Sequence, residues 1–331
     1  GTEPSAHRTR PIAAKEATVI EVTNAVKSYD SVKAVDGISF MARPGEIFGL
    51  IGPNGAGKST TIRMIMNILA PDSGSILLDG RPLQERDKER IGYLPEERGL
   101  YRKMKVGEIL AFLSEIKGGE RVSCAKRADE WLTRFGIADW KNRKVEELSK
   151  GMAQKVQFIG TVAHDPDVLL FDEPFAGLDP VSQDLMLESM LELKRAGKTL
   201  LFSTHIMDHA ERICERILLI DKGREVASGT LSEVKSRFGR DAVRIEYDGD
   251  ASFVGELPYI TGTREFPRWM EAELDGPEAA DRLFRDLAGR VRVRRFELLE
   301  PSLHSIFIRL VVTEAGHADD ARLEGQEVSG A

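Results

Sequence analysis

The chain contains little of what a disulfide-stabilised or membrane-spanning protein requires. It has two cysteines in 331 residues, Cys124 and Cys214, and no CxxC or Cys/His spacing of the kind that binds a metal. Two isolated thiols indicate small buried or half-buried side chains in a reducing compartment. No apolar run approaches the roughly 18 residues of a membrane helix. Residues 1–11 lack the apolar segment of a secretory signal peptide, so the sequence predicts neither kind of segment.

An excess of positive charge is also absent. The formal net charge is −7 and the isoelectric point is near 5.6. Proteins that bind nucleic acid usually carry a basic excess, so we do not expect a nucleic acid as partner. The apolar content of 41% and the charged content of 31% are ordinary for a globular protein. The length suggests about two domains.

One glycine-rich segment carries the strongest functional signal. It lies between Ile47–Ile51, which we predict as a buried strand, and Thr61–Leu69, which we predict as a helix. A glycine turn that binds nothing is the alternative, and a Gly-Lys-Ser sequence at this spacing argues against it. The segment fits the phosphate-binding pattern G-x-x-x-x-G-K-[ST] and reads Gly52-Pro53-Asn54-Gly55-Ala56-Gly57-Lys58-Ser59-Thr60.

These residue types match the needs of a bound triphosphate. Glycines at positions 52, 55 and 57 let backbone N–H groups approach phosphate oxygens closely. The N-terminus of the following helix directs unpaired N–H groups and a positive dipole end toward the same oxygens. Lys58 supplies a cation for the β and γ oxygens, and Ser59 offers a hydroxyl to Mg²⁺. We therefore predict a nucleoside triphosphate with Mg²⁺ at this loop.

Strands and helices alternate through most of the chain. This order predicts an α/β fold with a mainly parallel sheet covered on both faces, and a helical block inserted at about 100–164. We predict strands at 18–23, 34–40, 47–51, 76–78, 91–94, 168–171, 199–202 and 216–220, and helices at 106–116, 125–135, 156–162, 181–195 and 206–214.

A smaller α+β unit is predicted at 239–313. Its strands are expected at 242–247, within 261–273 (one or two strands) and at 291–297. Its helices are expected at 277–287 and at Pro301–Val311, which closes the unit. Residues 1–16 and 314–331 are predicted to be disordered tails.

A second motif places two carboxylates at the end of a strand. The predicted buried strand Val168–Phe171 is followed directly by Asp172 and Glu173. We predict that it lies beside the P-loop strand, with the ends of both strands at the same edge of the sheet. Asp172 would then hold Mg²⁺, directly or through water. Glu173 would polarise the attacking water as general base, although the pattern alone also fits an acidic turn.

Three further segments narrow the family. Glu147–Val156 opens a helix for which Ser149 is a good N-cap. Asp179 follows Asp172 by seven residues, and His205 comes just after the predicted strand at 199–202. With these segments in this order from about Ala17 to Gly229, the chain resembles the ATP-binding subunits of ABC transporters.

The resemblance implies a nucleotide site shared between two subunits. Leu148–Met152 reads LSKGM where the family has LSGGQ, so Ser149 and Gly151 are retained. In the family this helix N-terminus closes on the γ-phosphate held by the opposite subunit. Asp179 corresponds to the loop that links the two ATP sites. Tyr29 occupies the place of the aromatic that stacks on adenine, and an ordinary tyrosine at a strand edge is its alternative.

The resemblance also assigns the chemistry of hydrolysis. His205 corresponds to the histidine that senses the γ-phosphate and orients Glu173 and water, while Lys58 offsets the phosphate charge. A further position departs from the family pattern, because Glu96 stands where the family has a Gln that contacts Mg²⁺. A carboxylate binds Mg²⁺ more strongly than an amide oxygen. We therefore predict Ser59, Asp172 and Glu96 as its ligands.

As a whole, the resemblance implies a P-loop (RecA-like) core at 17–236 with an antiparallel β subdomain and the inserted helical subdomain. The segment from Glu300 to Ile308 resembles the accessory domain of prokaryotic exporter-type subunits. We expect an ATPase that binds ATP and Mg²⁺, pairs with a second copy or a similar subunit, and drives a separate transmembrane permease. It would then lie on the cytoplasmic side of the membrane. A soluble ABC-type ATPase without a permease is the alternative.

Overall fold

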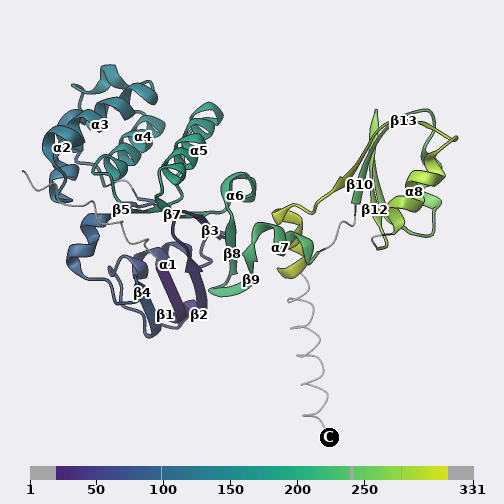
Figure 1. Cartoon of the computed structure of the whole chain (residues 1–331), viewed down its shortest axis with the longest axis horizontal. Helices are drawn as coiled ribbons and strands as arrows, with labels where there is room; N and C mark the ends of the chain where they lie inside the picture. Colours follow the sequence, from purple (N-terminus) through teal and green to yellow (C-terminus); the bar gives the residue numbers. More distant parts are fainter. Residues whose placement is uncertain (1–19, 98, 239–241, 277, 312–331) are drawn as a thin grey trace, which may run out of the picture.

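The computed structural model describes residues 20–97, 99–238, 242–276 and 278–311 (Figure 1). The predicted tails at 1–16 and 314–331, and the start of the first predicted strand, lie outside these residues. Three sheets organise the described chain: six strands with helices on them, three antiparallel strands, and four antiparallel strands in the C-terminal part. The predicted fold class is confirmed. Among the described residues, no helix combines the length and apolar character needed to cross a bilayer.

The six-stranded sheet has the order β5-β6-β7-β3-β8-β9, and only β9 is antiparallel to its neighbour. The strands β3, β6 and β7 are buried along their whole length, as expected for parallel strands covered on both faces. The bounds of the six are β3 (Ile47–Ile51), β5 (Ile91–Leu94), β6 (Val168–Asp172), β7 (Thr199–Thr204), β8 (Arg216–Asp221) and β9 (Arg224–Thr230).

The predicted neighbourhood of the P-loop strand was wrong in one respect. Strand β7 lies between β3 and β6 and pairs in parallel with both. A fully buried apolar run looks alike at every central position of a sheet, so the sequence did not distinguish direct neighbours from next neighbours. The predicted common edge is confirmed, because Ile51 is in register with Thr204 and Asp172 with Ser203.

Two apolar layers cover this sheet. One layer lies between the sheet and the antiparallel sheet β2-β1-β4 with α1, and the other contains the remaining helices. The elements of the first layer are β1 (Ile20–Tyr29), β2 (Val32–Ala42), α1 (Lys58–Ile65) and β4 (Ser73–Leu78). Those of the second are α2 (Val106–Ile116), α3 (Arg121–Arg134), α4 (Lys150–Val162), α5 (Pro180–Arg195), α6 (Met207–Ile213) and α7 (Leu231–Ser236).

The sequence did not predict β9 or α7. Strand β9 reads REVASGT, with only Ala227 buried, and α7 has six residues. Neither segment has enough apolar residues at a regular spacing to give a periodic signal. Tertiary pairing with β8 positions β9, and the Thr230 capping box starts α7.

The C-terminal sheet has the order β11-β12-β10-β13, with α8 packed on it. Two strands occupy the segment at 261–273, one of the two predicted possibilities. The bounds are β10 (Ala242–Asp248), β11 (Ile260–Phe266), β12 (Trp269–Leu274), α8 (Ala279–Leu287) and β13 (Arg292–Leu299).

The last helix packs differently from its predicted place. The helical residues 303–311 do not belong to the core of the C-terminal sheet. Leu303 and Ile306 are fully buried in the apolar cluster of the six-stranded sheet, together with Val234 of α7. The backbone N–H of Leu303 donates a hydrogen bond of 2.6 Å to Glu211 of α6. The chain therefore returns to the first domain after it has formed the second.

Candidate active site

The glycine loop leads from β3 into α1 at the carboxyl edge of the six-stranded sheet. A Cβ at Gly52 would lie 2.1 Å from the carbonyl oxygen of Ile220, and one at Gly57 would lie 2.3 Å from that of Ala34. Gly57 also has φ of 105°, a conformation that side chains rarely adopt. These two positions therefore require glycine, and helix α1 begins immediately afterwards at Lys58.

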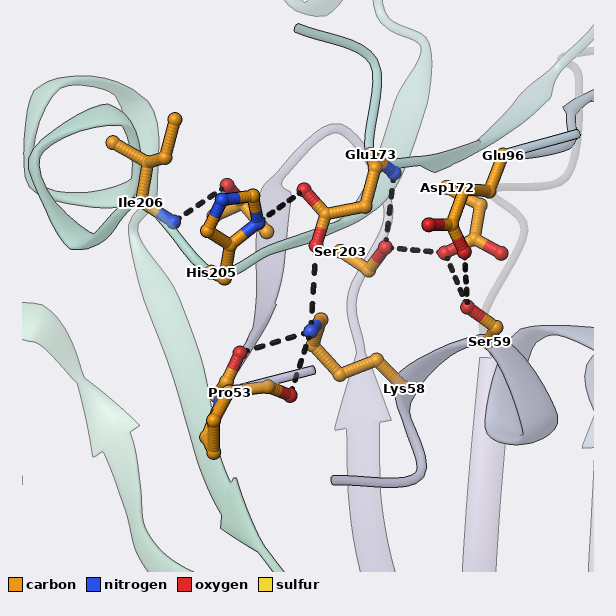
Figure 2. A network of polar contacts seen from close by, with 11 residues as sticks. Pro53, Lys58, Ser59, Glu96, Asp172, Glu173, Ser203, His205 and Ile206 are labelled. Atoms are coloured by element: carbon orange, nitrogen blue, oxygen red, sulfur yellow. Dashed lines mark hydrogen bonds and ion pairs between the residues drawn. The ribbon is translucent and has the colours of Figure 1, made fainter. Parts of the chain in front are cut away.

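The Lys58 ammonium group is held inside this loop (Figure 2). Its Nζ donates hydrogen bonds to the carbonyl oxygens of Gly52 at 2.8 Å and Pro53 at 3.1 Å. It also lies 3.3 Å from Oε1 of Glu173. The side chain is buried, so this ion pair lies in a medium of low dielectric constant, where charge interactions are strong. A cation is thus fixed beside the predicted general base.

Asp172, at the end of β6, is fully buried and has one free oxygen. Its Oδ1 accepts hydrogen bonds from Ser59 at 3.0 Å and from Ser203 at 2.5 Å. Its Oδ2 is buried and has no hydrogen-bond partner among the described residues. Burial raises the pKa of Asp172, repulsion from Glu96 and Glu173 acts in the same direction, and the two serine hydrogen bonds oppose the shift. A cation at Oδ2 would offset both the cost of burying the negative charge of Asp172 and its repulsion from the neighbouring carboxylates.

The donor set around Ser59 fits Mg²⁺. The Ser59 hydroxyl lies 3.0 Å from Asp172 and 3.4 Å from Oε2 of Glu96. Two carboxylates and a hydroxyl are the hard oxygen ligands that Mg²⁺ prefers, and the orphan Oδ2 of Asp172 is available to it. No group of three His, Cys, Asp or Glu side chains suited to a metal exists in the described part of the chain. Phosphate oxygens and water would therefore have to supply the remaining ligands of a bound Mg²⁺.

The Glu173 carboxylate contacts Lys58 on one side and His205 on the other. One carboxylate oxygen faces Lys58, and the other lies 3.0 Å from Nδ1 of His205 (Figure 2). The Glu173 backbone has φ of 49°, a strained value for a side chain of this size. Its N–H donates a hydrogen bond of 3.1 Å to Ser203. The carboxylate is thus fixed between a cation and an imidazole whose side chain is 48% exposed.

An open hollow above the loop is lined by eight of the predicted site residues. Six of them belong to the P-loop, including the predicted metal ligand Ser59, and the other two are the predicted ligand Glu96 and the predicted base Glu173. The lining residues are Ala34, Asn54, Gly55, Gly57, Lys58, Ser59, Thr60, Glu96 and Glu173. Of the remaining predicted residues, Gly52, Pro53, Asp172 and His205 are within one contact of this set, and Ala56 is buried within the loop.

The other four predicted residues do not line this hollow. Ser149 caps α4 by accepting a hydrogen bond of 3.2 Å from the Met152 N–H. Asp179 caps α5 through the Ser182 N–H, and hydrogen bonds from Ser182 lower its pKa. Tyr29 stands 43% exposed at the end of β1. A Cβ at Gly151 would lie 3.1 Å from the carbonyl oxygen of Gly177. Their predicted roles in nucleotide binding stay predictions.

Ser203 belongs to the site and was not singled out from the sequence. Its hydroxyl donates to Asp172 and accepts from the Glu173 N–H, so one buried group fixes both carboxylates. The available signal was its position, because it lies at the end of a strand that directly precedes His205. A serine is common at strand ends, and only the pairing of β6 with β7 reveals what it contacts.

Comparisons with known proteins identify the family. The ABC transporter family matches residues 35–176, and the C-terminal domain of DrrA1-3-like ATP-binding proteins matches residues 229–311. An uncharacterised ABC transporter ATP-binding protein of Bacillus subtilis (strain 168), YhaQ, is 43% identical over 88% of this chain and 98% of its own length.

The chain is also similar to relatives whose names are more specific and to a solved structure. The Nod factor export ATP-binding protein I of Burkholderia pseudomallei (strain 1710b) is 34% identical over 89% of this chain and 97% of its own length. The linearmycin resistance ATP-binding protein LnrL of Bacillus subtilis (strain 168) is 37% identical over 68% and 73%. A solved ATP-binding subunit of an ABC transporter is 33% identical, with a TM-score of 0.63 over 67% of this chain and 93% of that one. The chain therefore belongs to the ABC transporter family, as an ATP-binding subunit with ATPase activity.

Proposed function

We propose that this subunit powers export through a separate membrane permease, on the cytoplasmic side of the membrane. Two relatives, which match 89% and 68% of this chain, carry names of Nod factor export and of linearmycin resistance. The C-terminal residues match a domain of DrrA-like ATP-binding proteins. A permease is required because no described helix is suited to cross a bilayer, while the family is one of transporters.

The contact of Glu173 with both Lys58 and His205 is the observation that carries the proposed chemistry. The Glu173 carboxylate accepts a proton from a water molecule as the water oxygen attacks the γ-phosphorus and the bond to the bridging oxygen breaks. Nδ1 of His205 orients this carboxylate. Lys58 and the backbone N–H groups of the loop stabilise the charge that develops on the phosphate oxygens.

Mg²⁺ in this site would be held by Ser59, Asp172 and Glu96, as their contacts support. When bound, the ion neutralises charge between the β- and γ-phosphates. The protein would position the ion through Asp172, because Ser203 fixes this carboxylate by a hydrogen bond and its Oδ2 atom has no other partner among the described residues. Bound Mg²⁺ would also replace the repulsion among the neighbouring carboxylates with attraction.

We further propose that ATP draws two copies together, with the α4 N-terminus of one copy against the γ-phosphate held by the other. Ser149 and Gly151 support this arrangement because they start a 13-residue helix yet lie outside their own chain's hollow. Backbone N–H groups and the dipole of a helix N-terminus bind anions. Asp179 would connect the two nucleotide sites, and Tyr29 would stack on adenine.

Substitution of the α4 cap tests the shared site. Ser149→Asp keeps a good N-cap and so preserves the helix, but it places a negative charge against the γ-phosphate. In a Glu173→Gln background that also carries Arg244→Glu, which breaks the nucleotide-independent dimer proposed below, light scattering should show ATP-dependent dimers that the added Ser149→Asp abolishes. Thr230→Asp, at the cap of α7, is the matched control and should leave these dimers intact. Unchanged ATP-dependent dimerisation of the Ser149→Asp variant would exclude this role.

Isolation of the tagged chain from solubilised membranes tests the permease. We expect recovery of a multi-span membrane protein in a fixed ratio, together with ATP turnover that rises relative to the isolated chain. Recovery of the chain without a membrane protein would favour the alternative, an ABC-type ATPase that acts without a permease.

A further inference from the structure

The C-terminal sheet has one covered face and one open face. Val243, Ile245, Met270 and Ala272 are buried on the face that α8 covers. Figure 1 shows α8 on this side of the sheet and, among the described residues, no helix on the other. Because side chains alternate between the two faces of a strand, the residues between these positions project from the open face.

The strand register arranges the open face into rows. Arg264 of β11 is opposite Glu271 of β12, Glu271 is opposite Arg244 of β10, and Arg244 is opposite Glu297 of β13. The signs alternate across all four strands of this row. The two central residues already form an ion pair, with Arg244 Nη2 at 2.9 Å from Glu271 Oε1.

The next row has two aromatic residues at one end and a charge pair at the other. Across the sheet, from β11 to β13, this row consists of Phe266, Trp269, Glu246 and Arg295, each opposite the next. The two rings stack with centroids 3.7 Å apart, and Phe266 is 39% exposed. Arg295 lies 3.9 Å from Glu246 and is 57% exposed. Arg295 also pairs with Glu297 at 2.9 Å, so this row joins a partly exposed aromatic pair to exposed charged side chains, a composition that suits a binding surface.

We propose that this open face binds the same face of a second copy of the chain. A two-fold axis that runs parallel to the strands, midway between β12 and β10, reverses the strand order and preserves each row. Arg264 of one copy then faces Glu297 of the other, and Glu271 faces Arg244. Every position in the row meets the opposite charge, which is the complementarity that a symmetric interface requires.

The second row is complementary under the same axis. Arg295 faces the ring of Phe266, a cation–π arrangement, and the Trp269 indole N–H faces the Glu246 carboxylate. Face-to-face sheets pack about 10 Å apart with nearly aligned strands, a separation that long side chains of this kind can bridge. The rows of one copy therefore supply partners for all eight side chains of the other.

The charge pattern favours a second copy over a nucleic acid or an anionic bilayer. The two rows contain three arginines and three glutamates, namely Arg244, Arg264, Arg295, Glu246, Glu271 and Glu297. A polyanion requires a surface of one sign, whereas the charges of these two rows sum to zero. All these residues lie in β10–β13, away from the nucleotide hollow, so the interface needs neither ATP nor the shared active site proposed above.

Charge reversal of the central pair tests the interface in the nucleotide-free full-length chain. Wild type should sediment as a dimer. Arg244→Glu alone places two glutamates opposite each other across the axis, and Glu271→Arg alone places two arginines there. Each single variant should raise the dimer dissociation constant at least about tenfold, because like charges that face each other are unfavourable.

Mixing the two single variants separates an effect between copies from an effect within one copy. In an equimolar mixture, position 244 of one variant faces position 271 of the other with opposite charge, so the dimer should return. The pair within each chain stays broken, so a merely structural effect would not be rescued. Arg282→Glu, on the outside of α8, is the matched control and should sediment as wild type.

Three results would overturn the proposal: a monomeric wild type at tens of micromolar, single variants that dimerise as wild type does, or a mixture that stays monomeric while circular dichroism shows folded chains. Loss of ATP-dependent dimerisation through Ser149 would leave this assay unchanged, because it contains no nucleotide. The two proposals therefore fail separately.

Discussion

The two larger sheets of the molecule place their charged residues in opposite ways. The six-stranded sheet is buried on both faces and carries its charges at one edge, where Asp172 and Glu173 are almost completely buried. The C-terminal sheet carries charges across an open face, where arginines and glutamates alternate. Buried, incompletely paired charges are unfavourable and persist where they have a function. Exposed pairs contribute little energy individually, so their value lies in specifying which surfaces match.

The largest expected effect is on catalysis at the buried edge. Glu173→Gln removes the proton acceptor while it keeps the size of the side chain, so steady-state ATP turnover should fall by about 10²–10⁴-fold. Glu278→Gln, an exposed change on α8 of the other domain, should leave turnover unchanged. Both rates are measured as phosphate release at saturating ATP and Mg²⁺. A Glu173→Gln variant that retains more than a tenth of the wild-type rate would mean that another group accepts the proton.

The second effect is a loss of stability in acid that is confined to the first domain. Burial, with a contribution from Lys117, lowers the pKa of His164 from 6.5 to about 4. Between these values the unfolded chain binds a proton that the folded chain does not, so the free energy of unfolding falls as the pH falls from about 6.5 to about 4. The maximum loss is about 3 kcal/mol. The C-terminal sheet, residues 242–299, contains no histidine and should not share this loss.

Tryptophan fluorescence can follow the two domains separately. Trp131 and Trp140 lie in the helical subdomain, while Trp269 lies in the C-terminal sheet, so Trp269→Phe removes the second signal. In that background, urea unfolding at pH 7 and at pH 4.5 gives the acid-induced loss. His164→Gln should reduce the loss and the exposed His304→Gln should not. An unchanged loss in the His164→Gln variant would assign it to other groups.

The local parts of the active site were predictable from sequence, and the long-range parts were not. The glycine loop and the Asp172–Glu173 strand end are local, because glycine geometry and a buried apolar run determine them. The position of β7 between β3 and β6 depends on pairing between distant segments. The packing of Leu303 on the first domain has the same origin, since its apolar spacing suits either core equally well.

Ser203 and the open face show the same limit. A serine at a strand end is ordinary until β6 and β7 are paired in register. The alternating rows of the C-terminal sheet follow from three strand pairings, two of which contain a register shift. Charge spacing along one strand does not reveal what lies opposite on the next.

A smaller effect is expected from the serine that joins the two carboxylates. Ser203→Ala removes a donor to Asp172 and an acceptor for the Glu173 N–H, so ATP turnover should fall about tenfold, since lost buried hydrogen bonds are worth about 1–2 kcal/mol. Because the lost hydrogen bond lowers the pKa of Asp172, that pKa should rise, and the acid limb of the pH–rate profile should move to higher pH. Ser189→Ala removes an equally buried hydroxyl on α5 and should leave the profile in place.

The smallest effect is expected at Glu96, where the active-site edge carries a charge that the family pattern lacks. Glu96→Gln keeps an oxygen 3.4 Å from the Ser59 hydroxyl, so turnover should stay within about tenfold of wild type, with a higher Mg²⁺ concentration needed for half-maximal rate. Repulsion from Glu96 raises the pKa of Asp172, so its removal should move the acid limb to lower pH. This shift is opposite in direction to that expected for Ser203→Ala. The control Glu97→Gln, at the next position, should change neither the Mg²⁺ requirement nor the acid limb. Complete loss of Mg²⁺-dependent turnover in Glu96→Gln would contradict this account, because it would make the extra carboxylate indispensable rather than one of three ligands.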